Sequence, residues 1–439
     1  MHDIFPLAGL SDPKTVKVPK NSPAGSIVYC PGCRVTESVY QAEGDADLLR
    51  ARRAAVKTLQ LANLGIEKEK VVALAVESLD LSRRRDLSCF WFAMLALLYA
   101  EETGLVEDEL FRRALGPIWE KSQLHRGVLL LVRARARALT GGLPTAQGLF
   151  TRSLRAPLPP RLSEVCIAWQ VENLVEMGRV DEARDLLREH GYFEPGKVID
   201  DYPVLMAALG ALELAAGRYE QSLNCFLICG KQLSDHAVYN PAVIRWRSPA
   251  SECSSALRRR HLALHLAQED VAAAKSWGSP WSAGMAFHAL AVSQTDENTT
   301  QSFWAAAALL RESRIQRGQA KFYYDFATHL SEQNRLGEAG EMFKSSEYRA
   351  QVVDNSLWVE RAARGVQRVK STRSRQSLTK EEKGIATLAR LGLTNAEIAR
   401  RSHVTVSTVE QHLSNVYRKL RISQRGDLAY AMLPPCDWE

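Results

Sequence analysis

Two helix-start signatures of the same kind lie near the C-terminus and restrict the local fold more than any other stretch of the chain. Thr379 is followed three residues later by Glu382, and Thr394 is followed three residues later by Glu397. In this arrangement each side chain accepts a hydrogen bond from the backbone N–H of the other residue. Gly392 lies between the two signatures and can adopt the left-handed conformation that ends a helix. The pattern predicts two short helices separated by a tight turn.

A third helix is predicted directly after them, because Thr405 can cap a run in which apolar residues recur at helical spacing. The apolar residues fall on one side of that helix and are Val409, Leu413, Val416 and Leu420. The opposite side is polar and carries Ser407, Glu410, Gln411, Ser414 and Arg418. A helix that is anchored by one face and polar on the other can lie in a groove of another molecule.

This stretch resembles the DNA-binding domain of the LuxR/GerE-type transcriptional regulators, which are bacterial proteins. The residues that carry the resemblance are Leu378, Thr379, Glu382, Gly392, Leu393, Thr394, Asn395, Glu397, Ile398, Ala399, Val404, Thr408, Val409, Glu410, His412, Arg418, Lys419 and Leu420. The resemblance implies a four-helix helix-turn-helix domain over residues 378–434, with a reader helix at about 406–420 in the major groove of double-stranded DNA. The chain departs from the family pattern at Lys380, where the family usually has Pro, and at His403, where it usually has Gly.

The same resemblance implies roles for individual residues, with two copies of the domain binding DNA as a homodimer. The residues at positions that reach base edges are Glu410, Gln411 and Ser414. Those at positions that contact backbone phosphates are Thr405, Ser407, Thr408, His412, Arg418 and Lys419. The closing helix would pair two readers through Leu428, Ala431 and Met432. The residue types fit these roles, because Glu accepts from the amino group of cytosine and Gln pairs with adenine.

The distribution of charge favours DNA over the alternative that the polar row is only a solvated face. From Val366 to the end there are thirteen Lys or Arg against seven Asp or Glu. The whole chain has 57 Lys or Arg against 50 Asp or Glu, so its surplus of seven lies almost entirely in this C-terminal part. A concentrated basic excess is expected of a module that neutralises backbone phosphates.

The length of 439 residues predicts at least two domains. No window has the roughly 18 apolar residues that a membrane span needs, and no export signal is visible at Met1, so we expect a cytoplasmic protein without membrane contacts. Residues 1–40 are rich in Pro, Gly, Ser and Lys and are expected to form an irregular leader.

Residues 41–367 have the apolar period of helices, with breaks that recur. Glycines at 104, 141, 178 and 217 are separated by 37, 37 and 39 residues, and each lies between two apolar runs. Glycine at the turn and a small residue five positions later suit a pair of closely crossing helices. We therefore predict an all-α fold with a tetratricopeptide-like helical repeat domain. The repeat is hard to follow between Gly230 and Tyr323, so a non-repeating helical domain is the alternative.

Residues 368–377 are basic and without apolar periodicity, which predicts a linker between the two domains. Helical repeats followed by this reader resemble the C-terminal part of the large ATP-binding, maltose-activator-like LuxR-type regulators. The sequence has no phosphate-binding Gly-x-x-x-x-Gly-Lys-Ser/Thr motif, so we expect neither the ATPase domain nor a cofactor.

The predicted function is sequence-specific regulation of transcription, with the repeats sensing an unidentified effector or protein and RNA polymerase as a further candidate partner. One alternative is an interaction scaffold whose repeats do the work and whose terminal domain is not essential. Another is an enzyme or metal site built on Cys30 and Cys33, which are separated by two residues. No second Cys pair, catalytic triad or metal-binding helix supports that reading, so we expect no enzyme and no metal.

Overall fold

In the computed structural model of the chain, the described residues are 29–31, 33–34, 45–82, 86–192, 202–376, 378–420 and 422–431. The predicted irregular leader at 1–40 falls mostly outside them. Two short strands, β1 (Tyr29–Cys30) and β2 (Cys33–Arg34), pair in antiparallel register. All other regular elements among the described residues are helices, which confirms the predicted all-α fold.

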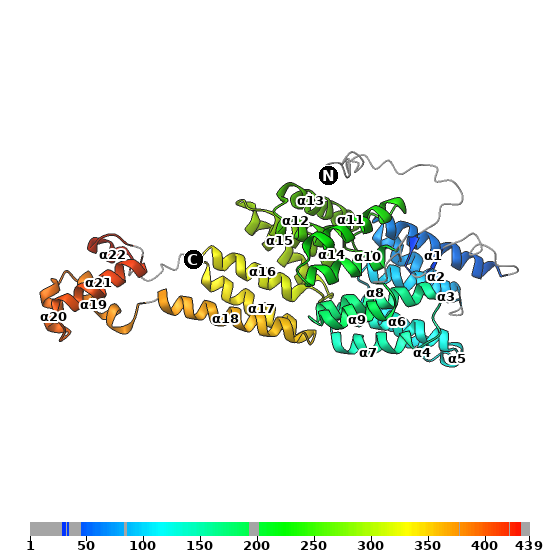
Figure 1. Ribbon diagram of the computed structural model, residues 1–439, viewed down its shortest axis with the longest axis horizontal. Coiled ribbons are helices and arrows are strands. Elements are labelled where there is room, and N and C mark those ends of the chain that lie inside the picture. The colour runs from blue at the N-terminus through cyan, green and yellow to red at the C-terminus, as the bar shows by residue number, and fades with distance from the viewer. Residues whose placement is uncertain are drawn as a thin grey trace.

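The helices of the N-terminal body follow one another with short connections, and Figure 1 shows them stacked as successive pairs. The first group is α1 (Ala46–Leu64), α2 (Lys68–Leu81), α3 (Leu87–Tyr99), α4 (Thr103–Ala114), α5 (Pro117–Lys121), α6 (Gln123–Thr140), α7 (Leu143–Leu154), α8 (Pro160–Glu176) and α9 (Val180–Glu189). The second group is α10 (Pro203–Ala215), α11 (Tyr219–Asp235), α12 (Arg247–Ala256), α13 (Arg260–Trp277), α14 (Pro280–Ser293), α15 (Asn298–Glu312), α16 (Gln319–Glu332), α17 (Leu336–Val352) and α18 (Ser356–Gln376).

One continuous hydrophobic core runs through this body from Tyr29 to Val369. Phe90, Phe150 and Phe322 are among its largest fully buried side chains. Because each helix pair packs on the next, the core is extended along the stack rather than gathered at one centre. The predicted helical-repeat architecture is thereby confirmed.

The turns between paired helices depend on residues with a positive φ angle. Gly141, Gly178 and Gly217 have φ of 137°, 77° and 73°, as the sequence predicted. Gly104 was predicted to do the same, and that prediction is wrong. It lies inside the first turn of α4, and the left-handed position is taken by Glu101 with φ of 65°. Glutamate gives no sequence signal for such a turn, so the nearby glycine was misread.

The repeat continues through the region where the sequence gives no clear sign of it. Arg258, which lies in that region, and Asn334, which follows it, have φ of 59° and 60° and hold the same place as Gly178. In each case an alanine five residues later is buried, and these are Ala183, Ala263 and Ala339. The turns also share a hydrogen bond. The residue after the left-handed one donates its backbone N–H to the carbonyl oxygen of the residue five positions earlier, in the preceding helix. The repeated feature is thus the left-handed turn and the small crossing residue, not glycine itself.

The segment predicted as an unpatterned linker is helical up to Gln376, because α18 continues through it. Trp358, Ala362, Val366 and Val369 are all buried and recur at helical spacing. This stripe packs α18 against the neighbouring α17. The prediction failed since the basic residues on both sides of Val369 hid the last apolar position of the stripe.

The C-terminal helices are α19 (Lys380–Arg390), α20 (Asn395–Arg401), α21 (Val406–Leu420), the 3-10 helix η3 (Arg425–Asp427) and α22 (Leu428–Ala431). They enclose a hydrophobic core of their own, which includes Ile385, Ile398, Val409 and Leu428. Figure 1 shows this group of helices beyond the end of α18. The fold is therefore a helical-repeat domain followed by a small, independent helical domain.

Candidate nucleic-acid interface

The two predicted capping arrangements are both formed, and they fix where α19 and α20 begin. Thr379 donates its backbone N–H to Glu382 Oε2 over 2.8 Å, and Glu382 N donates to Thr379 Oγ1 over 3.2 Å. The same pair of bonds joins Thr394 and Glu397, at 2.7 and 3.4 Å. These bonds satisfy amide groups that a helix start leaves without partners. Both helices thus begin where the sequence predicted.

The turn between α20 and α21 is tight and places one non-glycine residue in the left-handed region. His403 has φ of 54°. Val404 N donates to Ala399 O over 3.0 Å, which closes the end of α20. Thr405 then caps α21, because Thr408 N donates to Thr405 Oγ1 over 3.1 Å. The direction of α21 relative to α20 is set by these bonds.

Helix α21 is held in the domain by its apolar face. Val409 and Val416 are fully buried, Leu413 is 4% exposed, and Leu420 packs against the same core. Across the domain this face meets Ile385 of α19 and Ile398 of α20. The predicted buried stripe is confirmed.

The opposite face of α21 is presented outward as an uninterrupted polar row, which we call the reading row. Its members are all exposed and are Ser407, Glu410, Gln411, Ser414 and Arg418. Thr405 is also exposed, whereas Thr408 and His412 are half-buried along one edge of the row. With the backbone of α21 fixed by the core, these side chains form a rigid, polar, convex surface of the width of one helix. That shape is complementary to the major groove of B-form DNA.

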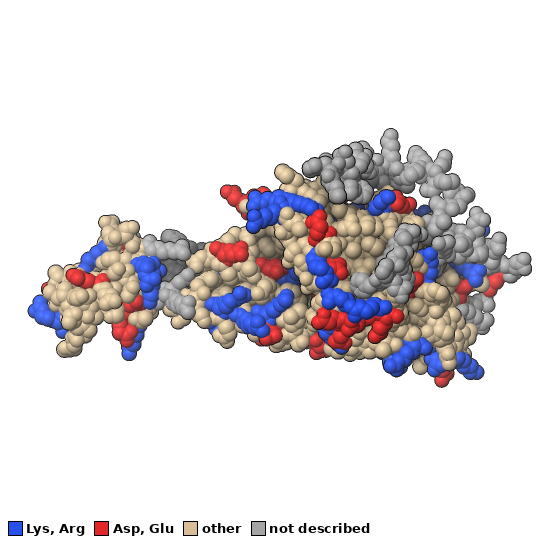
Figure 2. Space-filling model, in the orientation of Figure 1, with Lys and Arg blue, Asp and Glu red and all other residues tan. Residues whose placement is uncertain are grey.

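Further cations lie on the same domain outside the reading row. Lys380, Lys383, Arg390, Arg400 and Arg401 are exposed. Lys and Arg are visible along the edges of the domain in Figure 2. Such residues supply attraction to phosphates that does not depend on base sequence.

Lys419 differs from its predicted role as a phosphate contact. Its Nζ lies 2.5 Å from Glu382 Oε2, and the two side chains are only 13% and 6% exposed. Burial alone would raise the pKa of Glu382, but the bonds from Lys419 and from the backbone of Thr379 outweigh it and lower that pKa. The residue ties the end of α21 to the start of α19. Its charge is thus engaged inside the domain.

Arg425 is a structural residue that the sequence analysis missed. Its guanidinium donates to Asn395 Oδ1 over 2.7 Å and also to the backbone carbonyl of Leu393. The closing segment thereby clamps the start of α20. No local pattern announces this contact, because the partners are thirty residues or more apart.

The predicted dimer residues have different outcomes. Leu428 is fully buried in the core of its own domain, so its side chain does not reach a second copy. The physical reason is that α22 is short and needs one inward apolar anchor. Ala431 belongs to α22, but its side chain and all of Met432 lie outside the described residues.

The described cysteines behave as core residues. Cys30, Cys89, Cys166, Cys229 and Cys253 are buried. Burial raises the pKa of the Cys89 and Cys166 thiols to about 12, which suppresses the reactive thiolate. The side chain of Cys33 is not among the described residues, so a Cys30–Cys33 site stays outside what the structure tests. Elsewhere in the described residues, no three His, Cys, Asp or Glu side chains are grouped as metal ligands would be.

A helix capped by Thr394, a tight turn, and an outward-facing helix with an exposed polar row define a helix-turn-helix DNA-binding domain. Residues 376–432 match the family described as bacterial regulatory proteins of the luxR family. This segment of the chain is therefore a LuxR-type DNA-binding domain, as the sequence resemblance implied. No curated protein matches the chain. None of the described helices has the length and apolar character to cross a membrane.

Proposed function

We propose that this protein regulates transcription by placing α21 in the major groove at specific DNA sites. The observation that carries the proposal is the reading row, which is fully exposed on a helix whose other face is locked in the core. LuxR-type domains bind DNA in regulators. For this domain we propose which face binds the DNA and which role each residue on that face has.

In this proposal Glu410, Gln411 and Ser414 read base edges from the centre of the row. Thr405, Ser407, Thr408, His412 and Arg418 contact phosphates at its ends and edge. The exposure of the first group and the arrangement of the second support these roles. Lys419 is withdrawn from the phosphate group, since its ammonium is bonded to Glu382. Two chains would bind as a homodimer, because a pair of helix-turn-helix units reads two half-sites.

The repeat body at 41–367 is proposed as the sensing domain, and 378–434 as the reader. An extended stack of helix pairs offers a large surface for a partner or an effector. The protein is proposed to act in the cytoplasm, where DNA and RNA polymerase are accessible. It is proposed to do so without an ATPase domain in the described part of the chain.

The test is selection of duplexes from a random library by the full-length protein, followed by titration of the selected duplex by fluorescence anisotropy. We expect one enriched sequence, bound at least about a thousandfold more tightly than random DNA at physiological salt. Enrichment of no sequence, together with equal affinity for random duplexes, would contradict the proposal.

A further inference from the structure

The repeat body contains a cavity of about 610 Å³, within the usual size range of small-molecule sites. Residues from Leu95 in α3 to Arg361 in α18 line it, so that helices from most of the stack contribute to its wall. Much of the lining is aliphatic. The charged side chains that interrupt it are the feature that needs an explanation, because charges are costly to place in such surroundings unless they are paired.

One wall holds three arginines around a single carboxylate. Arg135 Nη1 lies 2.8 Å from Glu172 Oε2, and Arg317 Nη2 lies 3.5 Å from the same oxygen. Burial alone would raise the pKa of Glu172, but Arg135, Arg317 and Arg245 together hold it below the ordinary glutamate value. This carboxylate is therefore ionised, and it offsets one of three positive charges. Over the whole lining, five Arg or Lys side chains accompany four Glu side chains, which leaves a small excess of positive charge.

Arg245 has no hydrogen-bond acceptor and no ion-pair partner among the described residues. Its guanidinium lies over the Trp281 ring, 5.1 Å from the ring centre. Burial lowers the pKa of Arg245, and the carboxylates of Asp270 and Glu176 only partly oppose that effect. On the same wall, Nη1 of Arg317 is buried and also lacks a hydrogen-bond partner. Both arginines line the cavity, and these donors have no acceptor among the described residues.

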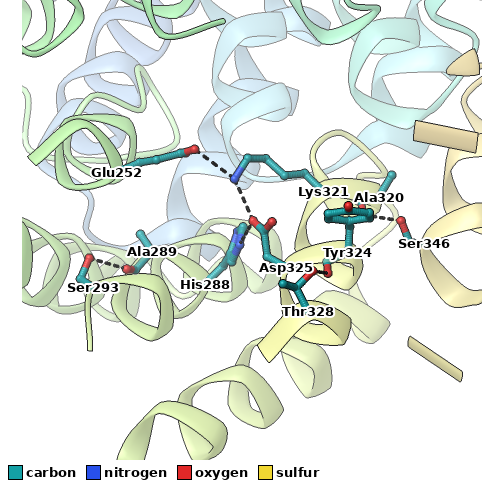
Figure 3. A network of polar contacts seen from close by, with 10 residues as sticks. All are labelled: Glu252, His288, Ala289, Ser293, Ala320, Lys321, Tyr324, Asp325, Thr328 and Ser346. Atoms are coloured by element: carbon teal, nitrogen blue, oxygen red, sulfur yellow. Dashed lines mark hydrogen bonds and ion pairs between the residues drawn. The ribbon is translucent and has the colours of Figure 1, made fainter. Parts of the chain in front are cut away.

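Lys321, which also lines the cavity, is paired with carboxylates. Charged side chains in this lining are therefore not generally left without partners. Lys321 Nζ lies 2.8 Å from Asp325 and 3.1 Å from Glu252, and His288 Nε2 lies 3.0 Å from the same Asp325 (Figure 3). Burial alone would lower the pKa of Lys321, but the two carboxylates outweigh it and raise that pKa. The lysine is fully engaged by the protein, so the free donors are those of Arg245 and Arg317.

Flat aromatic surfaces accompany the arginines. Arg135 lies 4.8 Å from the centre of the Trp169 ring, and Trp281 lies beneath Arg245. Both tryptophans line the cavity. A conjugated ring can stack on such surfaces while an attached anionic group reaches the guanidinium donors.

We propose that this cavity binds a small organic oxyanion with a flat apolar body, and that its anionic group accepts hydrogen bonds from Arg245 and Arg317. The inference rests on the proposed sensing role of the repeat body and names the chemical class that it senses. Helix α18 provides a path to the reader, because its Leu357, Trp358 and Arg361 line the cavity and it ends at Gln376, two residues before Leu378 of the LuxR-type domain. Carboxylate, sulfonate and phosphate share the chemistry required.

The experiment uses two fluorescent probes that differ only in the anion: 1-anilinonaphthalene-8-sulfonate and the neutral N-phenyl-1-naphthylamine. Each is titrated into the full-length protein, Arg245→Gln, Arg245→Lys and the control Arg53→Gln, which alters an exposed arginine on α1. We expect Arg245→Gln to weaken the sulfonate by roughly tenfold or more relative to the neutral probe, as the loss of a charge-assisted bond implies. Arg245→Lys should lose less, and Arg53→Gln should change neither probe.

An unchanged ratio of the two dissociation constants in Arg245→Gln would overturn the inference. Should that variant fail to fold, as judged by its thermal melt, the comparison of Arg245→Lys with Arg53→Gln decides, and an unchanged ratio in Arg245→Lys would also overturn it. Binding of the selected duplex is measured on the same samples. An unchanged probe ratio together with intact DNA binding would mean that this inference alone has failed. Failure of the proposed function would instead appear as absent binding of a specific duplex by the unaltered protein.

Discussion

At the scale of single residues, the reading row separates specificity from general affinity. Gln411 is exposed at its centre, so Gln411→Ala should cost roughly 1–3 kcal/mol on the selected duplex and almost nothing on random DNA. Arg418 is exposed at its end, so Arg418→Ala should weaken both duplexes alike and reduce the salt slope by about one unit. Anisotropy titrations at several salt concentrations measure both quantities. Equal losses on both duplexes for both variants would refute the assignment of roles.

Lys419 contributes to the stability of the C-terminal domain. Lys419→Met should leave Glu382 in a largely buried position without its ion pair and destabilise the C-terminal domain by about 1–3 kcal/mol. Because the pKa of Glu382 is lowered by folding, its contribution is fully present above the ordinary carboxyl pKa and is lost as pH falls through the lowered value. Urea unfolding of the unaltered protein and of Lys419→Met at neutral and acidic pH should therefore converge at low pH. A constant difference across that range would speak against the ion pair.

At the scale of elements, the turn before α21 offers a matched test of backbone strain. His403 has φ of 54°, a region that glycine enters without steric cost, so His403→Gly should stabilise the domain by roughly 0.5–1 kcal/mol. The neighbouring Ser402 has φ of −96°, and Ser402→Gly should destabilise by a similar amount, since glycine only adds freedom to the unfolded chain there. Thermal melts of the two variants compare them directly. Stability changes of the same sign in both would show that the turn is not strained at His403.

How far the elements could be predicted depends on whether their signals are local. The starts of α19 and α20 and the buried stripe of α21 were readable, because capping pairs and helical periods lie within a few residues of one another. The left-handed turns at Glu101 and Arg258 were not, since tertiary packing imposes that conformation on residues that do not favour it. The clamp from Arg425 to Asn395 and the wall around Glu172 join positions far apart in the chain. Such contacts exist only once the fold has brought the elements together.

At the scale of the whole molecule, the exposed surface of the repeat body gives few clues to its partner. Acidic and basic side chains alternate on the face shown in Figure 2, and the charges that distinguish the body lie inside, along the cavity. Trp281 belongs to both parts of this interior, because it is buried and also lines the cavity.

The last prediction concerns coupling between the two domains, and it follows from the continuity of α18. One helix contributes Trp358 to the cavity, buries Val369 against the repeat body and runs to Gln376, so a change in the body can be transmitted to the reader without a flexible joint before that point. The repeat body also offers far more surface than the small reader for holding two chains together.

We therefore expect the full-length protein and a 376–439 fragment to differ in affinity for the selected duplex by about 1–3 kcal/mol. Side-by-side anisotropy titrations at one salt concentration measure the difference. The fragment has its own core around Val409, and its cooperative thermal melt serves as the control for folding. Matching dissociation constants for a folded fragment and the full chain would show that the repeat body only tethers the reader.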